Sequence, residues 1–156
     1  MILAAGLMGA CAPTAPTPTL RAEPYVSGWP ARANAPANDL GGRWTGEASF
    51  AGCRAVYGSC KDFPRPAAIE LTVAQAASEL TGAMRFMGQE YMFAGYITIT
   101  SGVAGRALGD SGSFDVRFEH VGSALTGFIA SGSFDDPNLR LTSRYNVTAP
   151  LRRLGE

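Results

Sequence analysis

Residues 114–129 read Phe-Asp-Val-Arg-Phe-Glu-His-Val-Gly-Ser-Ala-Leu-Thr-Gly-Phe-Ile, and this stretch decides the fold. Phe114, Val116 and Phe118 are separated by charged residues, a period of two that is typical of a strand with one buried face. The Gly-Ser pair at 122–123 interrupts the pattern, as the turn of a hairpin does. Leu125-Thr126-Gly127 then begins a second strand, so the stretch predicts a β-hairpin.

The same pattern occurs earlier in the chain. Residues 69–84 read Ile-Glu-Leu-Thr-Val-Ala-Gln-Ala-Ala-Ser-Glu-Leu-Thr-Gly-Ala-Met, and an offset of 45 residues (114 minus 69) places Ile69 on Phe114. This offset also superimposes Leu80-Thr81-Gly82 on Leu125-Thr126-Gly127. The chain is therefore predicted to contain two related hairpins.

Strands of alternating polarity also flank these hairpins, at residues 42–50 and 139–147. With strands before, between and after the hairpins, we expect about eight strands in an antiparallel up-and-down meander. Closing such a sheet removes its exposed edges. We therefore predict an all-β barrel over residues 41–156, with an interior that side chains fill or that holds one small ligand. A transmembrane barrel with inverted faces is the alternative.

A family resemblance rests on short motifs. Gly42-Arg43-Trp44 in the first strand, the x-Leu-Thr-Gly hairpins and Arg152-Arg153 near the end resemble the lipocalin and avidin group of barrels. The resemblance implies that Trp44 plugs the closed end of the barrel and that Arg152 or Arg153 covers its ring in a cation–π contact. Trp29 and Trp44 are the only tryptophans, so the set that binds biotin in avidin is missing.

The N-terminus carries a second resemblance. Leu7-Met8-Gly9-Ala10-Cys11 resembles the lipobox of bacterial lipoproteins, and the apolar run before it is too short to span a bilayer. Residues 1–10 are thus predicted to be a signal peptide, truncated at its start because no basic residue precedes Arg21. Cys11 would carry the lipid, palmitate included, and Ala12 after it favours the outer membrane facing the periplasm. The alternative is that Cys11 is a buried thiol.

Residues 11–40 contain prolines at positions 13, 16, 18, 24, 30 and 36. Proline removes a backbone donor and fixes φ, so this segment is predicted to be an extended tether. It could place the barrel up to about 90 Å from the bilayer. Tyr25 and Trp29 interrupt the tether, and we expect them to pack against the open end of the barrel or, alternatively, to bind a partner.

The longest irregular insertion, residues 51–66, contains Cys53 and Cys60. A disulfide between them is predicted, because an oxidising envelope permits it. Basic and aromatic residues are frequent at binding hot spots, so this loop is either a partner surface or a structural lid. The residues concerned are Arg54, Tyr57, Lys61, Phe63 and Arg65.

The chemistry of an enzyme is not visible in the sequence. His120 is the only histidine, and it is predicted to be a solvent-facing residue beside a turn. The stretches 109–112 and 135–138 are interpreted as turns rather than calcium loops. No metal or cofactor is expected. The 13 acidic and 13 basic residues balance, which argues against nucleic acid as a partner.

Two functions follow from this sequence. The first is a non-enzymatic binding module of the bacterial cell envelope, held to the membrane by its lipid, with a protein partner: an accessory subunit of an envelope complex or a peptidase inhibitor that uses residues 24–40 as an arm. The second is a carrier or sensor of a small apolar ligand inside the barrel. The second predicts a cavity among phenylalanines, at positions 50, 86, 93, 114 and 118. The many large inward side chains favour the first.

Overall fold

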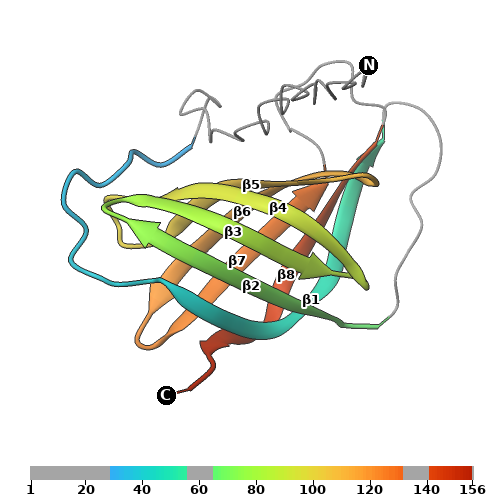
Figure 1. Ribbon diagram of the computed structural model, residues 1–156. Coiled ribbons are helices and arrows are strands. Elements are labelled where there is room, and N and C mark those ends of the chain that lie inside the picture. Colours follow the sequence, from blue (N-terminus) through green and yellow to red (C-terminus); the bar gives the residue numbers. More distant parts are fainter. Residues whose placement is uncertain (1–28, 56–64, 132–140, 156) are drawn as a thin grey trace, which may run out of the picture.

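The computed structural model describes residues 29–55, 65–131 and 141–155, and within them the protein is a closed, eight-stranded antiparallel β-barrel (Figure 1). Each strand pairs with its neighbours in sequence, and the first pairs with the last. The predicted fold is thereby confirmed. The strands are β1 (Gly42–Ala55), β2 (Ala67–Ala76), β3 (Glu79–Phe86), β4 (Gln89–Ile97), β5 (Val103–Gly109), β6 (Gly112–Val121), β7 (Ala124–Ser131) and β8 (Leu141–Arg153).

The alternation of the sequence places one apolar core inside the barrel. Leu71 and Phe118 are buried, whereas Thr72 and Glu119, which follow them in sequence, point outward and are exposed. The predicted inward residues of β8 follow the same rule, since Tyr145 is buried and Val147 packs against the core. Hydrophobic burial of this interior is the main force that closes the sheet.

The two predicted hairpins are β2–β3 and β6–β7, and they are equivalent in register. Val73 faces Gly82 in the first, and Phe118 faces Gly127 in the second. A Cβ atom on Gly82 would overlap the carbonyl oxygen of Thr72, and one on Gly127 would overlap that of Arg117. The repeated Leu-Thr-Gly motif therefore ends in glycine because the neighbouring backbone leaves no room for a side chain.

One end of the barrel, which we call the closed end, contains Trp44 and the turn that joins β6 to β7. Residues 29–40, here called the strap, run around this end before they enter β1 (Figure 1). Ala33 N donates to Ile97 O, and Ile99 N donates to Ala31 O, so the strap forms a short antiparallel bridge at the end of β4.

This arrangement corrects the prediction of a tether up to residue 40. The prolines at 30 and 36 do not prevent docking, because the backbone donor of the bridge is Ala33 N and its acceptor is Ala31 O, while Pro30 takes part only through its carbonyl oxygen. Leu40 is only 1% exposed, and its burial fixes the end of the strap at the barrel. The preceding part of the predicted tether, residues 11–28, lies outside the described residues.

The opposite, open end of the barrel is filled with aromatic rings. Phe86 contacts Tyr145 edge-on with 5.1 Å between ring centroids, and Tyr91 contacts Phe114 in the same way at 5.1 Å. Phe86 and Phe114 join the two pairs at 5.6 Å. Such edge-to-face contacts stabilise an aromatic cluster beyond its burial alone.

Candidate functional site

The closed end is built around Trp44. Its indole is 2% exposed, and its Nε1 donates to the carbonyl oxygen of Leu40 at 3.0 Å. The Arg153 guanidinium lies 5.9 Å from the centroid of the Trp44 ring and donates to Gly41 O. Arg152, by contrast, is exposed on β8. Of the two arginines expected at this position, it is Arg153 that covers the tryptophan.

The strap is held to the closed end by polar side chains. Gln75 accepts from the backbone nitrogen of Leu40 at 2.7 Å, and its amide nitrogen donates to Asn38 O at 3.2 Å. The amide of Asn38 lies 3.1 Å from Nδ1 of His120, which accepts its hydrogen bond. Gln75 and His120 occupy equivalent positions in the two hairpins. Each hairpin therefore contributes one side chain that forms a hydrogen bond with Asn38 of the strap.

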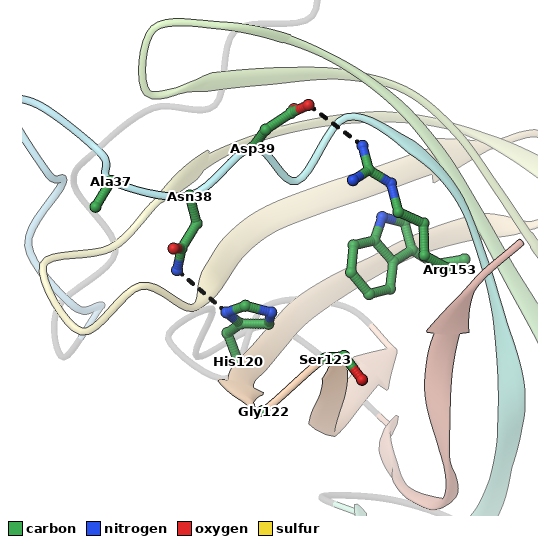
Figure 2. A pocket seen from close by; sticks show the side chains of 8 residues that line it. Ala37, Asn38, Asp39, His120, Gly122, Ser123 and Arg153 are labelled. Atoms are coloured by element: carbon green, nitrogen blue, oxygen red, sulfur yellow. Dashed lines mark hydrogen bonds and ion pairs between the residues drawn. The ribbon is translucent and has the colours of Figure 1, made fainter. Parts of the chain in front are cut away.

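A polar cavity of about 290 Å³ lies between the strap and the barrel (Figure 2). It is lined by Ala37, Asn38, Asp39, Trp44, His120, Gly122, Ser123 and Arg153. Figure 2 shows Asn38 and Asp39 of the strap on one side of this space, with His120, Ser123 and Arg153 of the barrel facing them.

The position of His120 differs from the prediction. It is half-buried and faces the strap, and its ring meets the Trp44 ring edge-on at 6.4 Å between centroids. The reason is that the strap passes over the β6–β7 turn, which the sequence alone did not place there. Through the contact of Nδ1 with the amide of Asn38, the His120 ring also touches the strap.

Charge at the mouth of the cavity is balanced within the protein. Asp39 accepts from the backbone nitrogen of Gly41 at 2.9 Å and pairs with Arg153 at 3.3 Å. The Gly41 hydrogen bond, followed by that of Arg153, holds the pKa of the Asp39 carboxyl below its ordinary value of 3.8. Asp39 is therefore ionised at neutral pH, and it bridges the strap to β8.

The start of the strap lies on the outside of the barrel. The Arg117 guanidinium of β6 lies 4.8 Å from the centroid of the Trp29 ring, and the ring centroids of Trp29 and Tyr96 are 6.2 Å apart. Tyr96 donates from its hydroxyl to Pro30 O at 2.8 Å, and Arg32 packs on its ring at 5.1 Å. Burial, opposed by Arg117 and Arg32, raises the pKa of Tyr96 above 10.0. Trp29 thus packs on the outside of the barrel against β4 and β6, and not at the open end as predicted.

The predicted partner surface is described only in part. Arg65 is exposed just before β2, and Cys53 is half-buried in β1. Arg54 belongs to β1, but its side chain is outside the described part. The disulfide stays a prediction, because Cys60 is not among the described residues. The same holds for Cys11, Tyr25, Tyr57, Lys61 and Phe63.

Some residues of this site had no signal in the sequence. Asn38 and Asp39 belong to the Pro-rich segment interpreted as a tether, and Tyr96 belongs to a strand without clear alternation. The one available signal for Gln75 was its equivalence to His120 in the repeat, which was interpreted as a shared turn position. The stretch 109–112 does form the turn that was predicted, between β5 and β6, while 135–138 is not described.

Among residues 29–55, 65–131 and 141–155, no group of three or more histidine, cysteine or acidic side chains is placed to hold a metal ion. The same ranges contain no helix of the length and apolarity that a membrane span requires. Comparison of the chain with protein-family models, with curated proteins and with solved structures found no match.

Proposed function

We propose that this protein is a lipid-anchored binding module of the bacterial cell envelope, which holds a protein partner and carries out no catalysis. The lipobox-like run that ends at Cys11 supports a lipid anchor in the cell envelope. We place the anchor in the outer membrane, with the protein facing the periplasm. The lipocalin-like closed end, in which Arg153 covers Trp44, supports the relation to small binding barrels. The protein would act either as an accessory subunit of an envelope complex or as a peptidase inhibitor.

The filled open end is the observation that carries the proposal. Small apolar ligands need an enclosed space of several hundred cubic ångströms. Phe86 and Phe114, which would line such a space, instead contact one another at 5.6 Å. The ring of Phe93 lies against Gly95 and Gly105, where added Cβ atoms would come within 2.7 Å and 2.6 Å of it. These contacts favour a module that binds through its surface over a carrier.

The docked strap limits which residues can contact a protein partner. A peptidase inhibitor with a free N-terminal arm would use residues that are not committed to the barrel. Residues 29–40 are committed through Asn38, Leu40 and the bridge to Ile97, so an inhibitory arm would have to lie before Trp29. The loop that precedes Arg65 is the other candidate surface.

The anchor is tested by metabolic labelling with an alkyne analogue of palmitate, in a Gram-negative host that expresses the chain from its native upstream coding sequence. The wild type is expected to incorporate the label and to fractionate with membranes. The variant Cys11→Ala should lose the label and enter the soluble periplasmic fraction, and Cys53→Ala is the matched control that should keep it. An unlabelled wild type would refute the anchor.

The filled interior is tested with a fluorescent fatty acid titrated into the full chain. We expect no saturable binding by the wild type. The variant Phe86→Ala should gain binding, because removal of a buried ring leaves a dry void. Met92→Ala, an exposed outward position of β4, is the control and should behave as the wild type. Stoichiometric binding by the wild type would favour the carrier instead.

A further inference from the structure

The cavity at the closed end lies between described residues of the strap and of the barrel, and we call it the closed-end cavity. Its volume of about 290 Å³ is close to the lower end of the range for sites that take small molecules. Ala37, Asn38 and Asp39 of the strap form one side, and the β6–β7 turn and Arg153 form the other (Figure 2). Trp44 lines this space and also belongs to the apolar core, so it separates the cavity from the interior of the barrel.

Fixed contacts hold the two sides of the closed-end cavity in place. Gln75 accepts from the backbone nitrogen of Leu40 at 2.7 Å, and the Trp44 indole donates to the carbonyl oxygen of the same residue at 3.0 Å. Asp39 and Arg153 join the strap to β8 at 3.3 Å. The site is therefore formed before a ligand arrives, which lowers the cost of binding.

The lining offers polar atoms that have no partner in the described part of the protein. These atoms are Nε2 of His120, Oδ1 of Asn38 and Oγ of Ser123. Because Nδ1 of His120 accepts from the Asn38 amide at 3.1 Å, the proton of the neutral ring is on Nε2, which is a donor. In Figure 2 this second nitrogen points away from Asn38, toward the side of the cavity where Ser123 lies. An amide oxygen accepts, and a serine hydroxyl both donates and accepts.

The charges and the apolar surface of the lining limit the class of ligand. Asp39 and Arg153 neutralise one another, so an anion would lie beside the carboxylate and a cation beside the guanidinium. An apolar ligand would gain little, because the Trp44 ring is only 2% exposed. Within the described ranges no cluster of side chains is suited to a metal ion. An uncharged polar molecule fits best.

We propose that the closed-end cavity binds a small, uncharged molecule rich in hydroxyl groups, of which a single sugar ring is the simplest example. Each hydroxyl of such a ring both donates and accepts, so several hydroxyls match a lining with mixed donors and acceptors. The Asp39 side chain, which is 73% exposed, adds an acceptor at the mouth. This site goes beyond the proposed protein partner, and it depends neither on that partner nor on the lipid anchor.

A ligand in this position would bridge the strap and the β6–β7 hairpin, through Asn38 on one side and His120 on the other. A ligand that binds only the docked strap stabilises the docked form by mass action. Hydrogen exchange of the Leu40 amide, which Gln75 accepts, should therefore slow as the sugar saturates the site. Unchanged exchange at saturation would contradict a site between the strap and the barrel.

The binding experiment titrates the isotope-labelled full chain with glucose, galactose and N-acetylglucosamine, and follows the His120 ring by NMR. His120 is the only histidine, so its two ring nitrogens need no further assignment to a residue. With at least one sugar we expect a saturable shift that is larger at Nε2 than at Nδ1. The control probes are cyclohexanol, which has one hydroxyl on an apolar ring, and glucuronate, which carries a charge. No saturable shift with any of the sugars, or an equal response to either control probe, would overturn the proposal.

Two serines supply a matched pair of variants. Ser123→Ala removes an exposed hydroxyl without a partner in the described part of the protein, so the fold should be unaffected. The dissociation constant of the sugar should rise roughly fivefold, the effect of one lost hydrogen bond. Ser113→Ala, at the other end of β6, should leave the constant unchanged. An unchanged constant in Ser123→Ala, or an equal rise in both variants, would also overturn the proposal.

Discussion

Gln75 and His120 hold the same residue of the strap from two equivalent hairpins. Gln75 donates to the backbone oxygen of Asn38 at 3.2 Å, and His120 accepts from the Asn38 side chain at 3.1 Å. Gln75 also accepts from the nitrogen of Leu40, a residue with only 1% exposure. The internal repeat of the sequence is thereby used to fasten a segment that lies outside the repeat.

Gln75 forms two hydrogen bonds with the strap and His120 forms one, so their removal should lower the free energy of unfolding by different amounts. Gln75→Ala would leave the Leu40 nitrogen without its acceptor, so the free energy of unfolding should fall by about 1–3 kcal/mol. His120→Ala removes one hydrogen bond and should cost about 1 kcal/mol. Denaturant unfolding followed by circular dichroism measures both. The double variant should cost less than the sum, because both residues act on Asn38. Full additivity would contradict this coupling.

The barrel could be predicted because its information is local. Alternation of Phe114, Val116 and Phe118 with charged residues identifies an inward face, and repetition of Leu-Thr-Gly identifies the hairpins. The two strands of each hairpin are formed by residues near each other in sequence. The role of Trp44, by contrast, was implied by the lipocalin resemblance of Gly42-Arg43-Trp44.

The docking of the strap could not be predicted for the opposite reason. The outward direction of Arg117 is visible in the alternation, but its contact with the Trp29 ring joins residues 88 positions apart in the sequence (117 minus 29). Proline-rich composition indicated a free tether, since it lowers the propensity for regular structure. It carries no information on single contacts such as that of Trp29 with Arg117.

Arg153 and Arg152 provide a matched pair for the closed end. Arg153→Ala removes the cation over Trp44 and the charged donor to Gly41, and the free energy of unfolding should fall by about 2 kcal/mol. Arg152→Ala changes an exposed side chain and should stay within about 0.5 kcal/mol of the wild type. Thermal and denaturant unfolding check this, and equal effects of the two substitutions would show that the closed end does not depend on the arginine cover.

Glycine in the Leu-Thr-Gly motif should resist substitution. In Gly82→Ala the new methyl group would meet the carbonyl oxygen of Thr72, so strands β2 and β3 must separate locally. We expect a loss of about 1–3 kcal/mol in the free energy of unfolding, the usual cost of overpacking. Thr81→Ala, at the exposed neighbouring position, is the control. A Gly82→Ala protein as stable as this control would contradict the steric explanation.

Stability at alkaline pH should report the burial of two tyrosines. Burial raises the pKa of Tyr96 and of Tyr145 above the ordinary value of 10.0. The sign follows from linkage: the unfolded chain releases these protons first, so the neutral rings stabilise the fold fully below pH 10.0, and this contribution is lost as the pH rises through the folded pKa. Unfolding free energies measured by denaturant titration should therefore fall more steeply above about pH 10 than ionisation of exposed groups alone explains.

The two tyrosines can then be separated, because only Tyr96 holds the strap. Tyr96→Phe should reduce the alkaline slope, and at neutral pH it should also cost about 1 kcal/mol through loss of the hydrogen bond to Pro30 O. Tyr145→Phe should reduce the slope while the contacts of its ring with Phe86 are kept. If both variants retained the wild-type slope, the tyrosines would be ionising as freely in the folded barrel as in the unfolded chain. The burial of Tyr96 beneath the strap would then have to be abandoned.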